Sequence, residues 1–120
     1  MSPVDAESRG LRLGDTVRVF NDRGSFVAAV QIVDYLTSGV IQIATGAWFD
    51  PAEPGTPGSL EKHGNPNVVT DDKGTSRLGQ SSVAQTTLVE VERITAPPDL
   101  TAFDWPPIAL KHDEAQANAT

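Results

Sequence analysis

The sequence predicts a mainly β domain, a small barrel or sandwich, with one short helix. Short apolar runs recur between turns rich in Gly, Pro and Asp, which is typical of antiparallel strands joined by tight connections. Helix signals are confined to the N-terminus. The chain has 120 residues, the length of a single domain. A domain of this size can bury a core without disulfides or metal sites.

The first element is a predicted helix over residues 2–10. Ser2 is a favourable N-cap, and Pro3 suits the first turn, where its missing N–H is not needed. The carboxylate of Asp5 favours the positive N-terminal end of a helix. Gly10 ends the predicted helix.

A hairpin is predicted next. Residues 16–21 alternate, with Val17 and Val19 on one face, which indicates a half-buried strand. The tight turn of residues 22–24 leads into residues 26–33. This second run is apolar on both faces and therefore predicts an interior strand.

Two further strands are predicted. Residues 40–44 form a short apolar run after a Ser-Gly turn. In residues 87–94, Val89 and Val91 alternate with acidic side chains, which again indicates a half-buried strand. Both runs are consistent with a mainly β fold.

A long segment over residues 49–77 interrupts this pattern. It is rich in Pro and Gly and has no periodicity. Loops this long inside a compact domain are either functional or disordered, and the specific polar residues here favour an ordered, functional loop. After Ile94, a proline-rich arm carries Phe103, Trp105 and Ile108, which are predicted to dock on a surface. We therefore expect one domain over residues 1–110 and a disordered tail over residues 111–120.

Composition excludes several classes of function. There is no cysteine, so thiolate metal sites and cysteine nucleophiles are ruled out. Of the two histidines, His63 and His112, the second falls in the predicted tail, so no two-His metal site is expected. Nucleotide-binding and hydrolase motifs are missing, and we predict no catalytic or metal-binding residue. The net charge of −7 disfavours nucleic acid as a partner, and no apolar run is long enough to insert into a membrane.

Side-chain amides gather in and beside the long loop, at Asn65, Asn67, Gln80 and Gln85. Amides offer both donors and acceptors, which suits a heteroaromatic ligand such as a pterin or guanine. Residues 81–85 are predicted to form a short helical turn whose N-terminus would favour an anion. From the residues alone, an equally good interpretation is that Asn and Gly simply make turns here.

Several blocks of sequence occur in an order that resembles a known family. They are Pro3-Val4-Asp5-Ala6, Gly14-Asp15-Thr16-Val17-Arg18-Val19-Phe20-Asn21-Asp22-Arg23-Gly24, Thr45-Gly46-Ala47-Trp48-Phe49-Asp50-Pro51, His63-Gly64-Asn65-Pro66-Asn67-Val68-Val69-Thr70, Gly74-Thr75-Ser76-Arg77-Leu78-Gly79-Gln80 and Gln85-Thr86-Thr87-Leu88-Val89-Glu90-Val91. The chain resembles the C-terminal molybdopterin dinucleotide-binding domain of the dimethyl sulfoxide reductase family, and within it the trimethylamine-N-oxide, biotin sulfoxide and dimethyl sulfoxide reductases.

The resemblance implies a double-psi β-barrel, an aspartate-decarboxylase-like barrel, that closes over a bis(molybdopterin guanine dinucleotide) molybdenum cofactor. Asn67 matches an Asn that binds one pterin. Gln85, with the backbone at Ala84, matches a Gly-Gln pair that contacts the pterin or its phosphate, and Ala84 stands where the family has Gly. Weaker candidates are His63, Asn65, Trp48 and Ser81.

The resemblance also implies that the chain is only part of an enzyme that reduces S-oxides or N-oxides. In the family, the molybdenum ligand and the substrate funnel belong to upstream domains, which are the expected partners. We therefore expect a fragment without reductase activity of its own, whose compartment, cytoplasm or periplasm, the sequence does not indicate. One alternative is a stand-alone barrel that acts as a small subunit or interaction module. A remoter one is a decarboxylase that cleaves itself at Gly58-Ser59.

Overall fold

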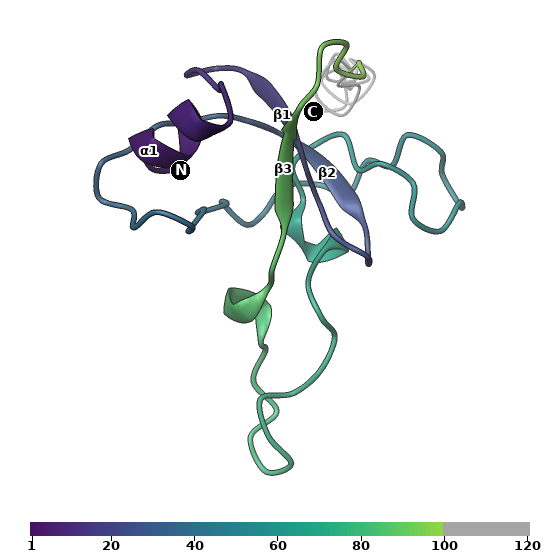
Figure 1. Cartoon of the computed structure of the whole chain (residues 1–120). Coiled ribbons are helices and arrows are strands. Elements are labelled where there is room, and N and C mark those ends of the chain that lie inside the picture. The colour runs from purple at the N-terminus through teal and green to yellow at the C-terminus, as the bar shows by residue number, and fades with distance from the viewer. Residues whose placement is uncertain (100–120) are drawn as a thin grey trace, which may run out of the picture.

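The computed structural model describes residues 1–99 and shows a small antiparallel sheet with few, short helices (Figure 1). The elements are α1 (Pro3–Ser8), β1 (Thr16–Phe20), β2 (Ser25–Ala29), the 3-10 turns η1 (Pro66–Val68) and η2 (Ala84–Thr86), and β3 (Glu90–Arg93). The prediction of a mainly β chain is confirmed. The predicted docking arm and the tail over residues 111–120 lie outside the described residues.

Helix α1 forms as its capping residues predict. The Ser2 hydroxyl accepts a hydrogen bond from the backbone N–H of Asp5 at 3.2 Å, and Pro3 occupies the first turn. Gly10, just beyond the helix, has a φ of +62°, a conformation that glycine adopts at little cost. Local signals therefore account for both ends of the helix.

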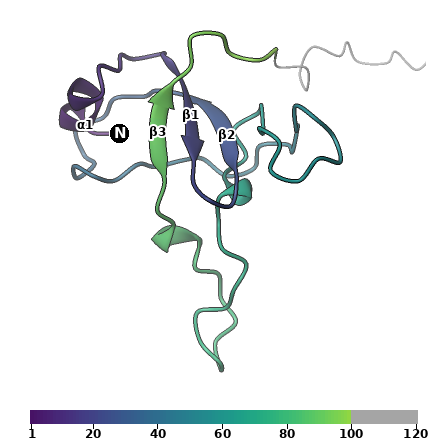
Figure 2. The same cartoon turned by 45° about the vertical axis from the view of Figure 1, so that its right-hand side comes forward.

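The sheet has the order β2-β1-β3, with β1 in the centre and both pairings antiparallel (Figure 2). Val19 of β1 stands opposite Phe26 of β2 on one side and Val91 of β3 on the other. The predicted hairpin is confirmed, and its turn is closed by the N–H of Asn21, which donates to the carbonyl of Gly24 at 3.0 Å.

The prediction that residues 26–33 form an interior strand is wrong. Strand β2 ends at Ala29 and lies at the edge of the sheet. Phe26 is nevertheless fully buried in the core, and a residue of the long loop pairs with that edge. The N–H of Val27 donates to the carbonyl of Glu61 at 2.9 Å, and the N–H of Glu61 donates to the carbonyl of Ser25 at 2.9 Å.

The prediction of a strand at residues 40–44 is also wrong. Ile41 and Ile43 pack against the core while Gln42 and Ala44 are exposed, so the alternation does report burial. Within residues 1–99, however, this segment pairs with no strand. Periodicity shows which face is buried, but it does not supply a hydrogen-bonding neighbour. The strand predicted at residues 87–94 forms over the shorter range of β3.

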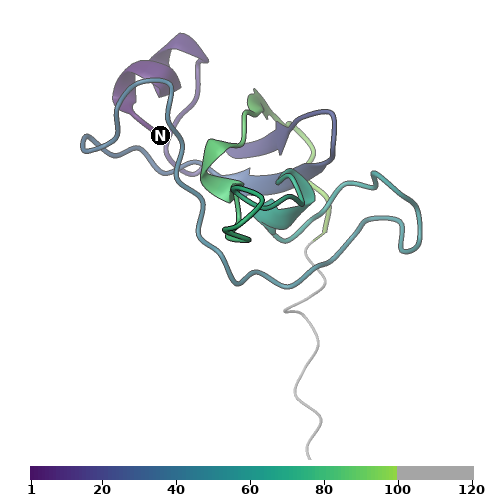
Figure 3. The same ribbon diagram turned by 90° about the horizontal axis from the view of Figure 1, so that it is seen from below.

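The core lies on one face of the sheet, where α1 and the loops meet it. Its buried members are Ala6, Leu11, Val17, Val19, Phe26, Val30 and Val69. Figure 3 shows α1 to one side of the sheet, with the chain after β2 passing along the sheet before it enters the long loop. The long loop thus contributes Val69 directly to the core.

The carboxylate of Asp5 ties α1 to the chain after β2. It accepts hydrogen bonds from the hydroxyls of Ser2 and Ser38 at 2.7 and 2.8 Å and from the N–H of Gly39 at 2.9 Å. The bond from Ser2, then those from Ser38 and Gly39, hold the pKa of Asp5 below its ordinary value.

This cluster makes stability depend on pH. A carboxylate whose pKa is lowered by folding stabilises the fold above its unfolded pKa, and that contribution is lost as the pH falls through the folded pKa. We expect Asp5→Asn to lower the melting temperature at neutral pH, with a difference from wild type that shrinks once the pH drops below 3.8. Thermal melts across this range, with Asp34→Asn at an exposed position as control, measure it. A difference that does not change with pH would refute this role of Asp5.

Candidate functional site

The side chain of Glu61 organises the long loop. It is fully buried, and both of its carboxylate oxygens accept hydrogen bonds from the backbone. Oε1 accepts from the N–H groups of Asp50 and His63 at 3.1 and 2.9 Å, and Oε2 accepts from the N–H of Asn65 at 2.7 Å. A buried carboxylate is tolerated only when such donors surround it. The three bonds therefore fix the two sides of the loop relative to each other.

Backbone pairing on either side of Glu61 reinforces this arrangement. The N–H of Lys62 donates to the carbonyl of Asp50 at 2.9 Å, and the N–H of Ala52 donates to the carbonyl of Leu60 at 2.8 Å. The side chains of Lys62 and Asp50 form an ion pair at 3.3 Å. Together with the bridge to β2, these bonds fasten the loop to the edge of the sheet.

The turn η1 presents Asn67 to the surface. Asn65 caps the turn, because its Oδ1 accepts a hydrogen bond from the N–H of Asn67 at 3.0 Å, and Pro66 occupies the first position. The side chain of Asn67 is exposed and forms no hydrogen bond within residues 1–99. Two neighbouring asparagines thus have different tasks: one builds the turn, and the other leaves its amide available.

The turn between β1 and β2 contacts the chain just after η1 and shortly after η2. The Nδ2 group of Asn21 donates to the carbonyls of Val69 and Leu88 at 2.9 and 3.1 Å. Gly24 lies so close to η1 that a Cβ there would stand 2.5 Å from the carbonyl oxygen of Val68, so only glycine fits without a shift of the backbone.

The predicted site residues fall into two groups. Trp48, His63, Asn65 and Asn67 belong to the part of the loop that Glu61 organises, and the Nδ1 atom of His63 lies 3.2 Å from the carbonyl oxygen of Trp48. The rest, Ser81, Ala84 and Gln85, follow later in the chain. The bonds from Asn21 to the segments after Asn67 and after Gln85 hold η1 and η2 at the same end of the molecule.

Ser81 lies on the finger, which we define as residues 71–83 and which projects from the body in Figure 1. The carbonyl of Ser81 accepts a hydrogen bond from the N–H of Thr75 at 2.9 Å, which ties it to the opposite side of the finger rather than to η1. Leu78, at the tip, is 99% exposed. The short helical turn predicted at residues 81–85 forms instead at Ala84–Thr86, where Gln85 is exposed and Ala84 is half-buried.

The side chains presented here suit hydrogen bonding and stacking. The amides of Asn67 and Gln85 each offer donors and an acceptor, and the ring of Trp48 is 76% exposed. Across residues 1–99, no cluster of acidic or histidine side chains has the arrangement of a metal site. In the same part of the chain, no helix is long and apolar enough to cross a membrane. Side chains of these types can hydrogen-bond and stack with a polar aromatic ligand.

Sequence reasoning overlooked Glu61 and Asn21. An acidic residue in a Pro-rich loop normally indicates a solvated surface, and no local pattern distinguishes Glu61 from its neighbour Glu53. Asn21 was predicted only as the last residue of the strand over residues 16–21. Its long-range bonds to Val69 and Leu88 have no signature in the sequence.

The role of Glu61 can be tested with Glu61→Gln. A glutamine keeps one acceptor and turns an NH2 group toward backbone donors, so we expect the free energy of unfolding to fall by about 2–3 kcal/mol. Hydrogen exchange at the amides of Asp50, His63 and Asn65 should accelerate together. The exposed Glu53→Gln is the matched control. Exchange that stays slow at all three amides would contradict the proposed organisation of the loop.

Comparison with known proteins identifies the family of the chain. Residues 1–88 match the family model described as "Molydopterin dinucleotide binding domain". The chain is 50% identical over 107 residues to a trimethylamine-N-oxide reductase of Salmonella typhi, which covers 88% of this chain and 13% of that protein. It is 47% identical over 110 residues to a dimethyl sulfoxide/trimethylamine N-oxide reductase of Rhodobacter capsulatus, covering 91% of this chain and again 13% of the relative. The chain thus spans a small part of the length of these reductases, and it belongs to the molybdopterin dinucleotide-binding domain family.

Proposed function

We propose that this chain binds and caps a bis(molybdopterin guanine dinucleotide) cofactor as the C-terminal domain of an oxidoreductase that reduces S-oxides or N-oxides. Membership of the family makes a molybdopterin dinucleotide the ligand to consider. The observation that carries the proposal is the exposed amide of Asn67, held on a turn that Asn65 caps and Glu61 anchors. A fixed, unpaired amide is what recognition of a pterin edge requires.

The double-psi β-barrel is the proposed form of this domain in the complete enzyme. Two features of the described residues support it. The bridge between Phe26 and Glu61 extends pairing beyond the edge of the three-stranded sheet. Residues 41–44 also keep a strand-like alternation of buried and exposed side chains beside that sheet.

Each candidate residue has a distinct proposed role. Asn67 binds one pterin, and Gln85 binds the pterin or its phosphate together with the backbone at Ala84. For Asn65, one lone pair of Oδ1 is engaged in capping, and its NH2 group is proposed as the donor to the ligand. His63, Trp48 and Ser81 are supporting contacts. When bound, the cofactor supplies the redox chemistry, while these residues bind and orient it.

The net charge of the chain gives a reason why cofactor binding should require the rest of the enzyme. Its net charge of −7 opposes the phosphates of the cofactor. The amides of Asn67 and Gln85 are neutral and contribute hydrogen bonds rather than charge. We therefore propose that upstream domains of the reductase supply the remaining contacts, and that the isolated chain binds the cofactor weakly.

A chimeric reductase tests these roles. Here this chain replaces the aligned region of the Salmonella typhi trimethylamine-N-oxide reductase. Losing one amide contact costs about 1–1.5 kcal/mol, so Asn67→Ala and Gln85→Ala should each weaken cofactor retention roughly tenfold. Molybdenum content and guanine nucleotide released on denaturation measure retention.

The matched control is Gln80→Ala: the resemblance assigns no cofactor contact to Gln80, and its NH2 group donates to the carbonyl of Ser76 at 3.2 Å on the finger. Its molybdenum content should equal that of the unmutated chimeric reductase. If Asn67→Ala and Gln85→Ala leave molybdenum content and turnover unchanged, the assignment of the site is wrong.

A further inference from the structure

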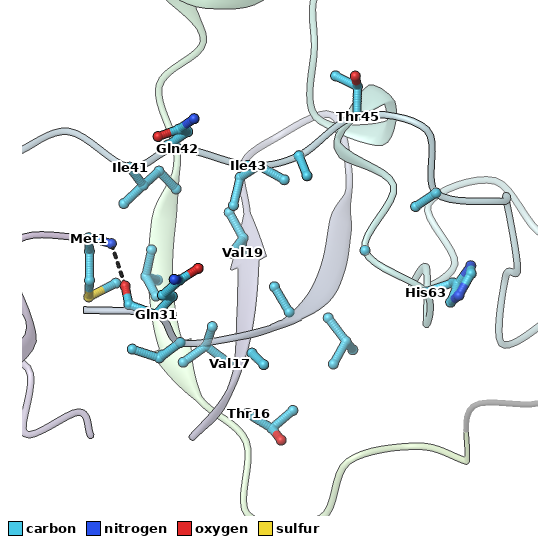
Figure 4. Close-up of a pocket in the computed structure, with 18 of the residues that line it drawn as sticks. Met1, Thr16, Val17, Val19, Gln31, Ile41, Gln42, Ile43, Thr45 and His63 are labelled. Carbon is cyan, nitrogen blue, oxygen red and sulfur yellow. Dashed lines mark hydrogen bonds between the residues drawn. The ribbon is translucent and has the colours of Figure 1, made fainter. Parts of the chain in front are cut away.

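A hollow of about 690 Å³ opens between the face of the sheet and residues 41–45 (Figure 4). Its wall on the sheet side includes Val17 and Val19 of β1 and Val91 of β3, and its other wall includes Ile41 and Ile43. Val17 and Val19 are almost fully buried, but Val91, Ile41 and Ile43 remain half-buried, so the hollow leaves part of an aliphatic surface open. Such a surface stabilises the protein only when another apolar group covers it.

The backbone beside the hollow also lacks partners. Within residues 1–99, the N–H and carbonyl groups from Ile41 to Ala44 form no hydrogen bond with any other residue. Most backbone polar groups in folded proteins are paired unless water reaches them. The segment has the side-chain alternation of a strand without a neighbouring strand, so it can accept one.

The two ends of the hollow are different. At one end lies Met1, whose ammonium group donates to the carbonyl of Gln31 at 2.8 Å. At the other end lie His63 and Gly64 of the long loop, as Figure 4 shows for His63. The hollow therefore runs from the N-terminal side of the chain to the candidate cofactor site.

We propose that an extended, mainly apolar segment from the remainder of a reductase chain pairs with residues 41–44 as an added strand and directs alternate side chains into this hollow. The identity of the partner rests on the proposed function. The aligned relatives are far longer, since this chain covers only 13% of their length. An extended peptide matches both features of the hollow, because its side chains bury the aliphatic walls while its backbone satisfies the unpaired edge.

Docking of the partner segment would also affect the candidate cofactor site. A segment in the hollow would end against His63 and Gly64, next to the loop that carries Asn67. Covering the hollow and completing the cofactor site would then be achieved by one docking event. A segment of ordinary strand length, about five or six residues, is sufficient to pair with residues 41–44.

The chain contains no cysteine, so a single introduced thiol reports on the hollow. We would measure the rate of iodoacetamide labelling at Ile43→Cys, by peptide mass spectrometry, in the isolated chain and in the chimeric reductase. Thr45→Cys, a small change at an exposed position on the wall, repeats the test without removing a core side chain. Thr56→Cys, in an exposed part of the long loop, is the control.

Both hollow positions should react about tenfold or more slowly in the chimeric reductase than in the isolated chain, while Thr56→Cys reacts equally in both. Hydrogen exchange at residues 41–44 should slow in parallel. Equal labelling in the two contexts would overturn the proposal. So would protection of the isolated chain that rises with its concentration, since a second copy would then be the occupant.

The same chimeric reductase separates this proposal from the proposed function. Retention of molybdenum with an unprotected hollow would reject the docking segment and leave the cofactor role intact. A protected hollow without molybdenum or guanine nucleotide would support the docking segment and reject the cofactor role.

Discussion

The carboxylate of Glu61 is the interaction on which the described structure depends. The main chain of Glu61 pairs with the outer edge of β2. Its side chain accepts hydrogen bonds from three N–H groups on both sides of a loop that has no regular secondary structure. Hydrogen bonds to a buried carboxylate are stronger than those between neutral groups. A buried donor or acceptor left without a partner lowers the free energy of unfolding. One residue thereby joins the sheet, the loop and the turn that presents Asn67.

The β1–β2 turn complements Glu61 from the opposite side. Asn21 bonds to the segments that follow η1 and η2, and Gly24 permits the close approach of Val68. Both contacts come from the turn of the β1–β2 hairpin. The regular hairpin therefore positions the irregular long loop and the chain after η2. This is the usual division between a rigid scaffold and the loops that carry function.

The sequence was informative wherever the determining contacts are local. The cap at Ser2 and the turn before Gly24 have signatures within a few residues, and both form as predicted. The strand expected at residues 40–44 was wrong because alternation reports burial and not pairing. Glu61 was missed because its backbone partners in β2 are distant along the chain, and because the bonds of its carboxylate to nearby N–H groups have no sequence signature. Asn67 was one of several amide candidates until the family resemblance singled it out, and the structure then distinguished its exposed amide from that of Asn65, which caps the turn.

The central claim is that Glu61 holds the loop in the conformation that binds the cofactor. The most direct measurement is the molybdenum content of the chimeric reductase carrying Glu61→Gln, read together with hydrogen exchange at the amides of His63 and Asn65. We predict that exchange accelerates and molybdenum is lost, while the spectroscopic signature of the fold is kept. Full molybdenum content in a protein whose two amides exchange freely would contradict the claim.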